Sequence, residues 1–385
     1  MLKIGTGWSE DSDTAEATQD ALKLAQDQLG GQPAKAAMVF AGIDMDLEVL
    51  TRELAEALPG VPVAGCTTDG EVAGPEGFLE DSVVITLFAS DAVDFTVGMG
   101  AGATGTPAQA TADAVNMAKA ASDKAPALCI ALPEGLGTNI HHLLNGLRDQ
   151  LGEDFPIVGG AAGDQLRFQG TKQFMNQTIV NDAMVVLMMH GPVIYSCGVA
   201  TGYEPLGNRH TITKAEGATV YEIDDRPAAD LYADYLQQPS IFYPLAVYEE
   251  KRQSFVLSSP LNFDEETGAI QLVNPVENAA RVQLATATRD EIVDAARTAV
   301  QSAYAGFPSN RTPDLALFFS CAGRRATLGT RTAEEYESIA DIVGEDIPTS
   351  GFYTYGEIGP DQPQGRSVTH TNAFLAVLLG TQETV

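Results

Sequence analysis

The chain contains Pro348-Thr349-Ser350-Gly351-Phe352-Tyr353-Thr354-Tyr355-Gly356-Glu357, a stretch whose pattern occurs three times. The two earlier copies are Pro62-Val63-Ala64-Gly65-Cys66-Thr67-Thr68-Asp69-Gly70-Glu71 and Pro156-Ile157-Val158-Gly159-Gly160-Ala161-Ala162-Gly163-Asp164. Each copy has a proline, two further residues, a glycine, a short loop, a second glycine and a closing carboxylate. Such self-similarity predicts a fold assembled from equivalent supersecondary units.

The sequence around each copy repeats as well. Apolar strands are expected before the copies at 37–41, 127–132 and 315–320, and apolar strands after them at 82–88, 183–189 and 373–379. Between the first strand and each copy lies a helix, with apolar stripes at 47–58, 140–151 and 336–343. Further helices are expected at about 11–29, 107–122 and 289–305. The continuous apolar strands predict sheets that are covered on both faces.

Three helix starts carry recognisable signals. Thr288 with Glu291, and Thr332 with Glu335, have the spacing of a capping box, in which each side chain accepts a hydrogen bond from the backbone N–H of the other residue. Pro227 predicts the start of a helix running through Leu231 to Leu236, within a strand-rich region at about 193–285.

These patterns predict an α/β fold of two pseudo-related halves, each built from repeated strand-helix-strand units with mixed sheets flanked by helices. A chain of 385 residues is too long for one ordinary core, which also favours at least two domains. The simplest division is an N-terminal domain at 1–190 and a C-terminal domain at 191–385.

The charge balance argues against two classes of partner. The chain has 52 Asp and Glu against 22 Lys and Arg, a formal net charge of −30 at pH 7. Such a surface repels nucleic-acid phosphates and anionic lipid head groups. We therefore expect neither nucleic acid nor membrane as a partner.

The sequence also predicts a cytoplasmic protein. Residues 1–7 lack the basic start and apolar run of a signal peptide, and the longest apolar run, at 183–189, is far shorter than a membrane span. The four scattered cysteines, at 66, 129, 197 and 321, form neither a disulfide framework nor a zinc motif, so buried free thiols are expected.

The third copy has the composition of a small-molecule pocket. Aromatic rings and a carboxylate follow its glycine, and a cysteine and an arginine end the neighbouring strand. Arg324 is expected to clamp a ligand carboxylate and Glu357 to accept an ammonium group. The predicted ligand-binding residues are Cys321, Arg324, Tyr353, Tyr355, Gly356 and Glu357, with Gly65, Cys66, Thr67, Thr68 and Glu71 of the first copy as a second site or as scaffold.

Four stretches resemble signature segments of the FIST family, in the family's order and across nearly the whole chain. They are Val63 to Glu71, Phe319 to Arg324, Gly351 to Ile358, and Thr213 to Asp224. The resemblance implies FIST N-terminal and C-terminal domains in a signal-input protein that binds a small ligand such as an amino acid. With no length left for an output domain, the chain is expected to act through a separate signalling partner.

A haem-binding nitric oxide sensor is an alternative, because some proteins that resemble this chain bind haem and regulate a histidine kinase or a diguanylate cyclase or phosphodiesterase. An axial ligand is then needed, commonly His. His210, beside Arg209, is the first choice among the histidines at 141, 142, 190, 210 and 370. Covalent haem is not expected, since the chain has no C-x-x-C-H motif.

Catalysis is not expected, although a cysteine-dependent enzyme stays open as a further alternative. Cys66 and Cys321 are the potential nucleophiles, but no histidine is placed beside either by the sequence. The chain also lacks a G-x-S-x-G elbow, an H-E-x-x-H motif and a phosphate-binding Walker loop.

Overall fold

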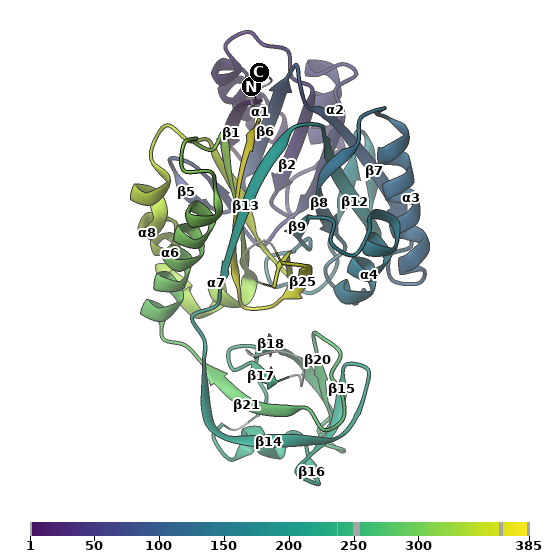
Figure 1. Ribbon diagram of the computed structural model, residues 1–385, viewed down its shortest axis with the longest axis vertical. Helices are drawn as coiled ribbons and strands as arrows, with labels where there is room; N and C mark the ends of the chain where they lie inside the picture. Colours follow the sequence, from purple (N-terminus) through teal and green to yellow (C-terminus); the bar gives the residue numbers. More distant parts are fainter. Residues whose placement is uncertain (1, 237, 249–254, 362–364, 383–385) are drawn as a thin grey trace.

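The computed structural model describes residues 2–236, 238–248, 255–361 and 365–382. It shows a body made of three equivalent α/β units. A separate β module, at residues 204–286, lies below this body in Figure 1. The predicted α/β class, with mixed sheets flanked by helices, is confirmed.

Each unit has the same order of elements. A first strand and helix are β1 (Leu2–Ser9) and α1 (Thr14–Leu29), β7 (Asp94–Ala101) and α3 (Pro107–Ala120), and β13 (Val193–Ala200) and α6 (Arg289–Gly306). A second strand and helix are β2 (Ala36–Ala41) and α2 (Leu47–Ala57), β8 (Pro126–Pro133) and α4 (Ile140–Leu151), and β22 (Leu315–Cys321) and α8 (Ala333–Val343). The last pair is separated by α7 (Ala322–Leu328) and the 3-10 helix η1 (Gly329–Arg331).

The glycine-containing copies form the third strand and the loop after it. The third strands are β3 (Val63–Thr67), β9 (Ile157–Gly160) and β23 (Thr349–Thr354), each parallel to the second strand of its unit. A short hairpin follows: β4 (Glu71–Ala73) with β5 (Gly77–Leu79), β10 (Gln173–Met175) with β11 (Thr178–Val180), and β24 (Glu357–Pro360) with β25 (Ser367–His370). The returning strands are β6 (Val83–Ser90), β12 (Ala183–His190) and β26 (Phe374–Thr381).

The three units exchange these hairpins in a closed cycle. The hairpin of the first unit completes the sheet of the third, with order β13-β26-β22-β23-β4-β5. The hairpin of the third completes the sheet of the second, and that of the second completes the sheet of the first, with orders β25-β24-β9-β8-β12-β7 and β1-β6-β2-β3-β10-β11. No unit has a complete sheet by itself, so the three fold as one body.

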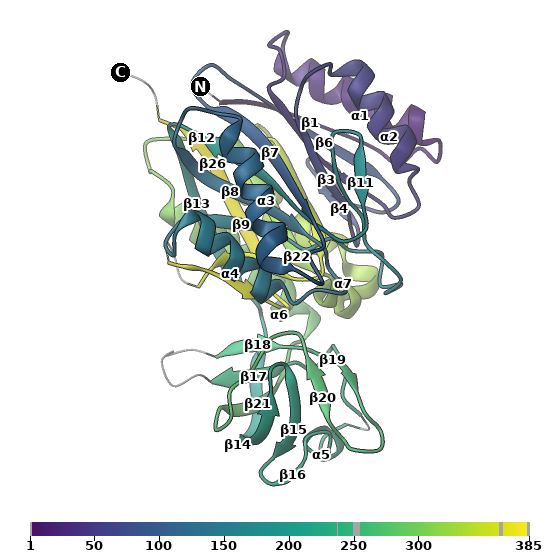
Figure 2. The same ribbon diagram turned by 90° about the vertical axis from the view of Figure 1, so that its right-hand side faces the viewer.

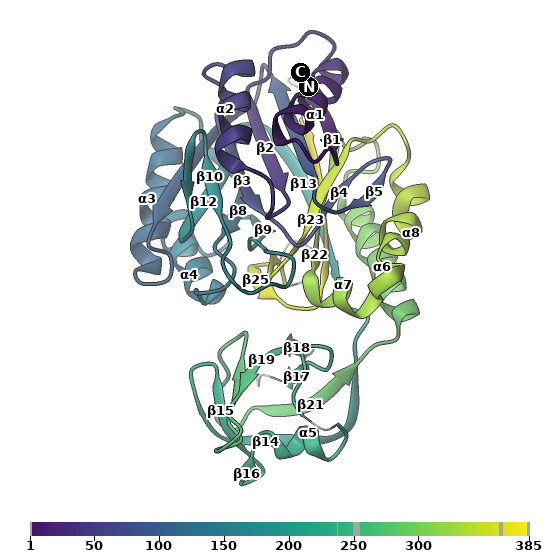
Figure 3. The same cartoon turned by 180° about the vertical axis from the view of Figure 1, so that it is seen from behind.

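One core joins all three sheets. Their inner faces bury side chains such as Phe40, Phe88, Leu187, Phe319 and Phe352 together, while separate clusters fill the space between each sheet and its own two helices. Figure 3 shows the three sheets and their outer helices from behind. Because the strands bury both faces, their sequences are continuously apolar and do not alternate between apolar and polar residues.

The helices approach the first strands closely. A Cβ on Gly5 would lie 1.9 Å from the carbonyl oxygen of Ala25 in α1, and a Cβ on Gly98 would lie 1.9 Å from that of Ala114 in α3. Only glycine on the strand and a small residue on the helix permit this contact. The glycines of the Gly5-Thr6-Gly7 stretch therefore allow α1 to pack closely against β1.

Most predicted elements are confirmed, including the capping box of Thr288 and Glu291 at α6. The second predicted capping box is wrong: Thr332 has no side-chain capping bond, because Glu335 turns instead toward Arg324. The helix predicted from Pro227 is also wrong in its extent. Pro227 lies in the short strand β16 (Arg226–Pro227), and α5 covers only Asp230–Ala233.

The β module is inserted between β13 and α6. Its strands are β14 (Glu204–Glu216), β15 (Thr219–Ile223), β16, β17 (Leu245–Tyr248), β18 (Val256–Ser258), β19 (Pro260–Phe263), β20 (Ile270–Leu272) and β21 (Arg281–Thr286). It has its own apolar core and reaches the body beside β18 (Figure 2). The predicted division at 190 and 191 falls between the second and third units and stays a prediction, since the hairpins cross it.

None of the helices in the described part of the chain has the length and apolar character needed to cross a bilayer.

Candidate functional site

The three glycine-containing loops meet at one place in the body, which we call the loop junction (residues 67–71, 161–164 and 353–357). Each loop donates to its neighbour in the same cyclic sense: Asp69 N to Tyr353 O at 2.9 Å, Tyr355 N to Ala161 O at 3.3 Å and Gly163 N to Thr67 O at 2.9 Å. A second ring runs the opposite way: Tyr353 N to Gly70 O, Ala161 N to Gly356 O and Thr67 N to Lys172 O. The carboxyl ends of β3, β9 and β23 therefore converge at the junction. The repeated pattern predicted three equivalent loops, but it did not show that these loops touch one another.

A buried polar side chain begins each exchanged hairpin at an equivalent position. Glu71, Gln173 and Glu357 are all fully buried, and each accepts the backbone N–H at the start of a returning strand. The donors are Ser82 at 3.3 Å, Ala183 at 3.0 Å and Ala373 at 3.2 Å. These side chains hold each hairpin to the strand that follows it, which gives Glu71 and Glu357 a structural role.

Glu71 is also bonded to the hydroxyls of Thr68 and Ser82. Burial nevertheless raises the pKa of Glu71 to about 7, because the apolar surroundings disfavour its charged form more than these bonds favour it. The residue is therefore poised to exchange a proton near neutral pH.

Asp69 lies at the centre of the junction and is fully buried. Its Oδ2 contacts the guanidinium of Arg325 at 3.2 Å, whereas its Oδ1 has no hydrogen-bond partner among the described residues. The N–H of Leu166 points toward this carboxylate but donates to the hydroxyl of Tyr355 at 2.7 Å. Burial raises the pKa of Asp69 to about 6 despite the nearby arginine.

Arg325, not Arg324, is the cation of the junction. From α7 its guanidinium reaches the carbonyl and the carboxylate of Asp69 and also pairs with Glu80 at the surface. The ring of Phe78 lies 5.2 Å from the guanidinium carbon. The side chain is 17% exposed, so it lies between the buried Asp69 and solvent.

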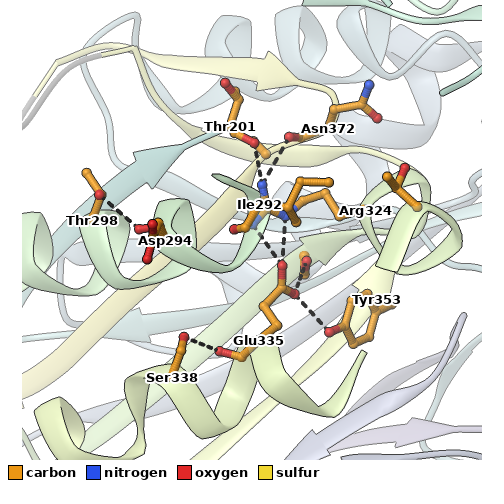
Figure 4. A network of polar contacts seen from close by, with 12 residues as sticks. Thr201, Ile292, Asp294, Thr298, Arg324, Glu335, Ser338, Tyr353 and Asn372 are labelled. Carbon is orange, nitrogen blue, oxygen red and sulfur yellow. Dashed lines mark hydrogen bonds and ion pairs between the residues drawn. The ribbon is translucent and has the colours of Figure 1, made fainter. Parts of the chain in front are cut away.

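Arg324 lies in a closed network inside the third unit (Figure 4). Its guanidinium bonds Glu335 at 2.8 and 3.0 Å and donates to the carbonyls of Thr201 and Ile292 at 2.6 and 2.7 Å. Tyr353 donates its hydroxyl to Glu335 at 2.8 Å. The predicted ligand clamp thus has its donors directed at interior groups, and Tyr353 serves the same network.

Tyr355 faces the second loop. Its hydroxyl donates to Asp164, and its ring stacks on Phe168 with centroids 5.5 Å apart. Although burial raises the pKa of Asp164, the bonds from Tyr355 and from backbone N–H groups of residues 168–170 outweigh it and hold that pKa below its usual range.

Residues 164–170 form a loop that covers the junction, which we call the covering loop. Gln165, Leu166 and Phe168 have φ of +57°, +56° and +52°, a left-handed backbone that costs energy for residues with side chains. Side chains tie the loop to the first unit: Arg167 bonds Asp44 at 2.7 Å and Gln165 bonds Asp81 at 2.6 Å. Phe168 is 56% exposed above Tyr355.

The remaining predicted residues are packed into the walls of the junction. A Cβ on Gly65 would lie 2.2 Å from the ring of Phe174, and a Cβ on Gly356 would lie 2.5 Å from Ile140. Thr67 and Thr68 are fully buried. These glycines allow exchanged hairpins and neighbouring helices to pack closely.

The two candidate nucleophiles are poor thiolates. Cys66 and Cys321 are both buried, and burial raises the pKa of each thiol far above its ordinary value. Burial likewise raises the pKa of Glu357, which lies against Cys321. A raised pKa leaves little thiolate on either cysteine, which disfavours a thiolate mechanism.

His210 lies on the β module, where its Nδ1 pairs with Asp224 at 2.7 Å. Its Nε2 is buried without a partner in the described part of the chain. His190 bonds Thr96 and the carbonyl of Lys124 and ends β12. Within the described ranges no group of three His, Cys, Asp or Glu side chains is arranged to hold a metal ion.

Sequence reasoning missed Asp69, Asp164 and Arg325 as members of the site. Asp69 stands inside the repeated pattern, so its position after Thr68 was the available signal. Arg325 follows Arg324 directly, and neighbouring residues of a helix point about 100° apart. Nothing in the sequence shows which of the two faces the junction.

Comparisons with known proteins identify the family of this chain. The FIST N domain matches residues 35–226 and the FIST C domain matches residues 228–360. An uncharacterized protein of Mycobacterium tuberculosis strain H37Rv is 26% identical over 386 residues, covering 93% of this chain and 95% of its own length. An uncharacterized protein of Mycobacterium bovis is 24% identical over 399 residues, covering 96% of both chains.

Among solved structures, cyanuric acid hydrolase from A. caulinodans aligns over the full length of both chains with a TM-score of 0.41 and 11% identity. A likeness this low says nothing about the activity of the present chain. FIST domains are sensory domains of signal transduction that bind small ligands. The two domain matches together span most of the sequence, and the chain belongs to the FIST family.

Proposed function

We propose that this protein is a signal-input protein that binds an amino acid or a similar small polar metabolite at the loop junction and acts through a separate signalling partner. The observation that carries the proposal is the pairing of the buried Asp69 carboxylate with Arg325. Oδ1 of Asp69 is an acceptor without a partner in the described part of the chain, and a buried acceptor of this kind is costly unless something donates to it.

The two side chains match the two ends of an amino acid. An ammonium group is a donor for Asp69, and a guanidinium binds a carboxylate through two parallel bonds. Arg325 and Asp69 therefore take the roles that the sequence assigned to Arg324 and Glu357. Tyr355 contributes an aromatic wall and Asp164 a second carboxylate.

The covering loop supplies a route of entry. It lies over Tyr355 and is held by the side-chain bonds of Gln165 and Arg167 to the first unit. Breaking a few exposed contacts is a smaller cost than opening the buried rings of backbone bonds at the junction. Movement of this loop would admit the ligand and would also change the surface that a partner meets.

Isothermal titration with a panel of amino acids tests the proposal. Wild-type protein is expected to bind at least one of them, and Asp69→Asn and Arg325→Gln are each expected to weaken that binding at least tenfold. Arg331→Gln is the matched control, because Arg331 is a surface arginine that pairs with Asp290 and Glu334. Binding that is absent in the wild type, or equal in Asp69→Asn, would contradict the proposal.

Haem binding is the second candidate, and the unpartnered Nε2 of His210 is the observation that favours it. Asp224 orients this ring through Nδ1, as carboxylates commonly orient metal-binding histidines. An absorption spectrum of protein purified from haem-supplemented cells tests it. A Soret band that His210→Ala removes would favour haem, and a featureless spectrum would exclude this candidate.

A further inference from the structure

Two linkers join the β module to the body. They are residues 201–203, between β13 and β14, and residues 287–288, between β21 and α6. The first linker packs against the start of the helix that follows the second: a Cβ on Gly202 would lie 2.4 Å from the carbonyl oxygen of Glu291 in α6. The two connections of the module therefore lie together at one place on the body.

The buried guanidinium of Arg324 lies at this place (Figure 4). It donates to the carbonyl oxygen of Thr201 in the first linker at 2.6 Å and to that of Ile292, in the first turn of α6, at 2.7 Å. It also lies 3.5 Å from the carbonyl oxygen of Asn372, whose side chain donates to Ser259 of the module at 3.1 Å. One side chain thus contacts the chain where it leaves the body, where it returns, and where the module rests on the body.

The end of α7 holds the same region. The carbonyl oxygen of Thr327 accepts from Nε of Arg289 at 3.0 Å, and its hydroxyl lies 3.4 Å from that of Tyr203. Leu328 is buried in an apolar cluster that includes Tyr203 and Leu257 of the module. Helix α7 therefore has one side that is directed at the connections of the module.

Another side of α7 is directed at the loop junction. Arg325 contacts the carboxylate of Asp69 at 3.2 Å. A second connection runs through Tyr353, whose carbonyl oxygen accepts from the N–H of Asp69 at 2.9 Å. The hydroxyl of Tyr353 donates to Glu335 at 2.8 Å, and Glu335 pairs with Arg324 at 2.8 Å. Direct contacts therefore join the junction to both linkers of the module.

The module is able to change its position as a unit. It has its own apolar core, and its bonds to the body include three from the turn before β26. These are Thr369 with Asn274 at 3.2 Å, Thr371 with the carbonyl oxygen of Leu257 at 3.0 Å, and Asn372 with Ser259 at 3.1 Å. A part that has its own core and is joined by two short linkers can move as a rigid body about those linkers.

We propose that α7 couples the loop junction to the position of the β module, so that a ligand at the junction changes how the body holds the module. A ligand that binds Arg325 and Asp69 competes with the contact between them. A shift of Arg325 moves the short helix that also carries Arg324 and Thr327, and so changes the hold on both linkers. The regulatory role of this coupling rests on the function proposed for the junction, whereas the coupling itself does not.

Double electron-electron resonance of the full-length protein tests the coupling without a ligand. Spin labels are attached at Glu56→Cys in α2 and at Glu216→Cys at the end of β14, which are exposed positions, while the four native cysteines are buried. Arg325→Gln and Tyr353→Phe are each expected to shift the distance between body and module or to broaden its distribution about twofold.

Tyr353→Phe is a mild change, because Glu335 keeps Arg324 and the hydroxyl of Ser320 as partners. Lys124→Gln is the control and should leave the distance unchanged, since it breaks a surface ion pair with Asp94 in the second unit.

A second pair of labels, at Glu56→Cys and Asp113→Cys in α3, lies within the body and should keep its distance in every variant. A change in one of the two test variants identifies the contact that carries the coupling. The proposal is overturned if neither variant changes the distance between body and module, or if the pair within the body broadens equally.

The amino acids of the titration panel test the regulatory role with the same labels. An amino acid that binds is expected to shift the distance between body and module and to leave the distance within the body unchanged. Binding without this shift would overturn the regulatory role and leave the proposed function intact. If no amino acid binds, the proposed function and the regulatory role both fail, and the two variants still decide whether α7 couples the junction to the module.

Discussion

The guanidinium of Arg325 contacts the carboxylate of Asp69, 256 residues earlier in the chain, at 3.2 Å. The neighbouring Arg324 turns away from this site and pairs with Glu335 inside the third unit. Two adjacent arginines therefore have different tasks: Arg325 joins the third unit to the first, and Arg324 stabilises the third unit from within. The stability of the variants should separate these tasks.

Arg324→Met is expected to lower the free energy of unfolding by about 3–5 kcal/mol, because it leaves the buried Glu335 without its charge partner. Denaturant unfolding measures this change. The double variant Arg324→Met, Glu335→Leu should recover part of the loss, since it removes both charges. A double variant as unstable as the single one would show that the ion pair is not the source of the effect.

Stability should fall as pH rises through neutrality, and Glu71 should account for part of that fall. Its pKa is about 7 in the folded protein and 4.5 in the unfolded chain, so the folded state binds the extra proton and loses its benefit as pH rises. Between pH 6 and pH 8 the contribution is about 1 kcal/mol. Glu71→Gln should reduce the pH dependence of urea unfolding by this amount, while Glu56→Gln, at an exposed position of α2, should not change it.

Gly163→Ala should weaken the loop junction. A Cβ at this position would lie 2.7 Å from the backbone nitrogen of Asp69 and 2.9 Å from the carbonyl carbon of Thr68, neither of which can move without breaking the ring of bonds. Overpacking of this kind costs about 1–3 kcal/mol. Gly105→Ala is the control, because a Cβ there meets no atom within 4 Å. Equal unfolding midpoints for the two variants would contradict the tight junction.

The four cysteines should be unreactive in the folded protein. All are buried, and burial raises the pKa of Cys129 and of Cys197 to about 12, so almost no thiolate is present at pH 8. A thiol reagent that absorbs on reaction should report slow labelling in buffer and four thiols in denaturant. Rapid labelling of Cys321 in the folded protein would instead revive a cysteine-dependent activity.

Local sequence was sufficient to predict the repeated elements. Apolar stripes at helical spacing, continuous apolar strands and the three glycine-containing copies each report on a few neighbouring residues, and the structure confirms them. The wrong predictions also came from patterns of neighbouring residues. Glu335 has capping-box spacing, yet a buried arginine offers its carboxylate a stronger partner than the N–H of a helix end.

By itself, the sequence determined that three strand-helix-strand units exist and where their helices and strands lie. The reason is that the pattern of apolar and small residues that defines each element involves only residues of the same unit. Only the tertiary structure decided that the three hairpins exchange, that the loops meet in one junction, and that Arg325 and Asp69 join there. Those contacts link residues 96 to 284 positions apart, and their energy depends on which surfaces are buried together.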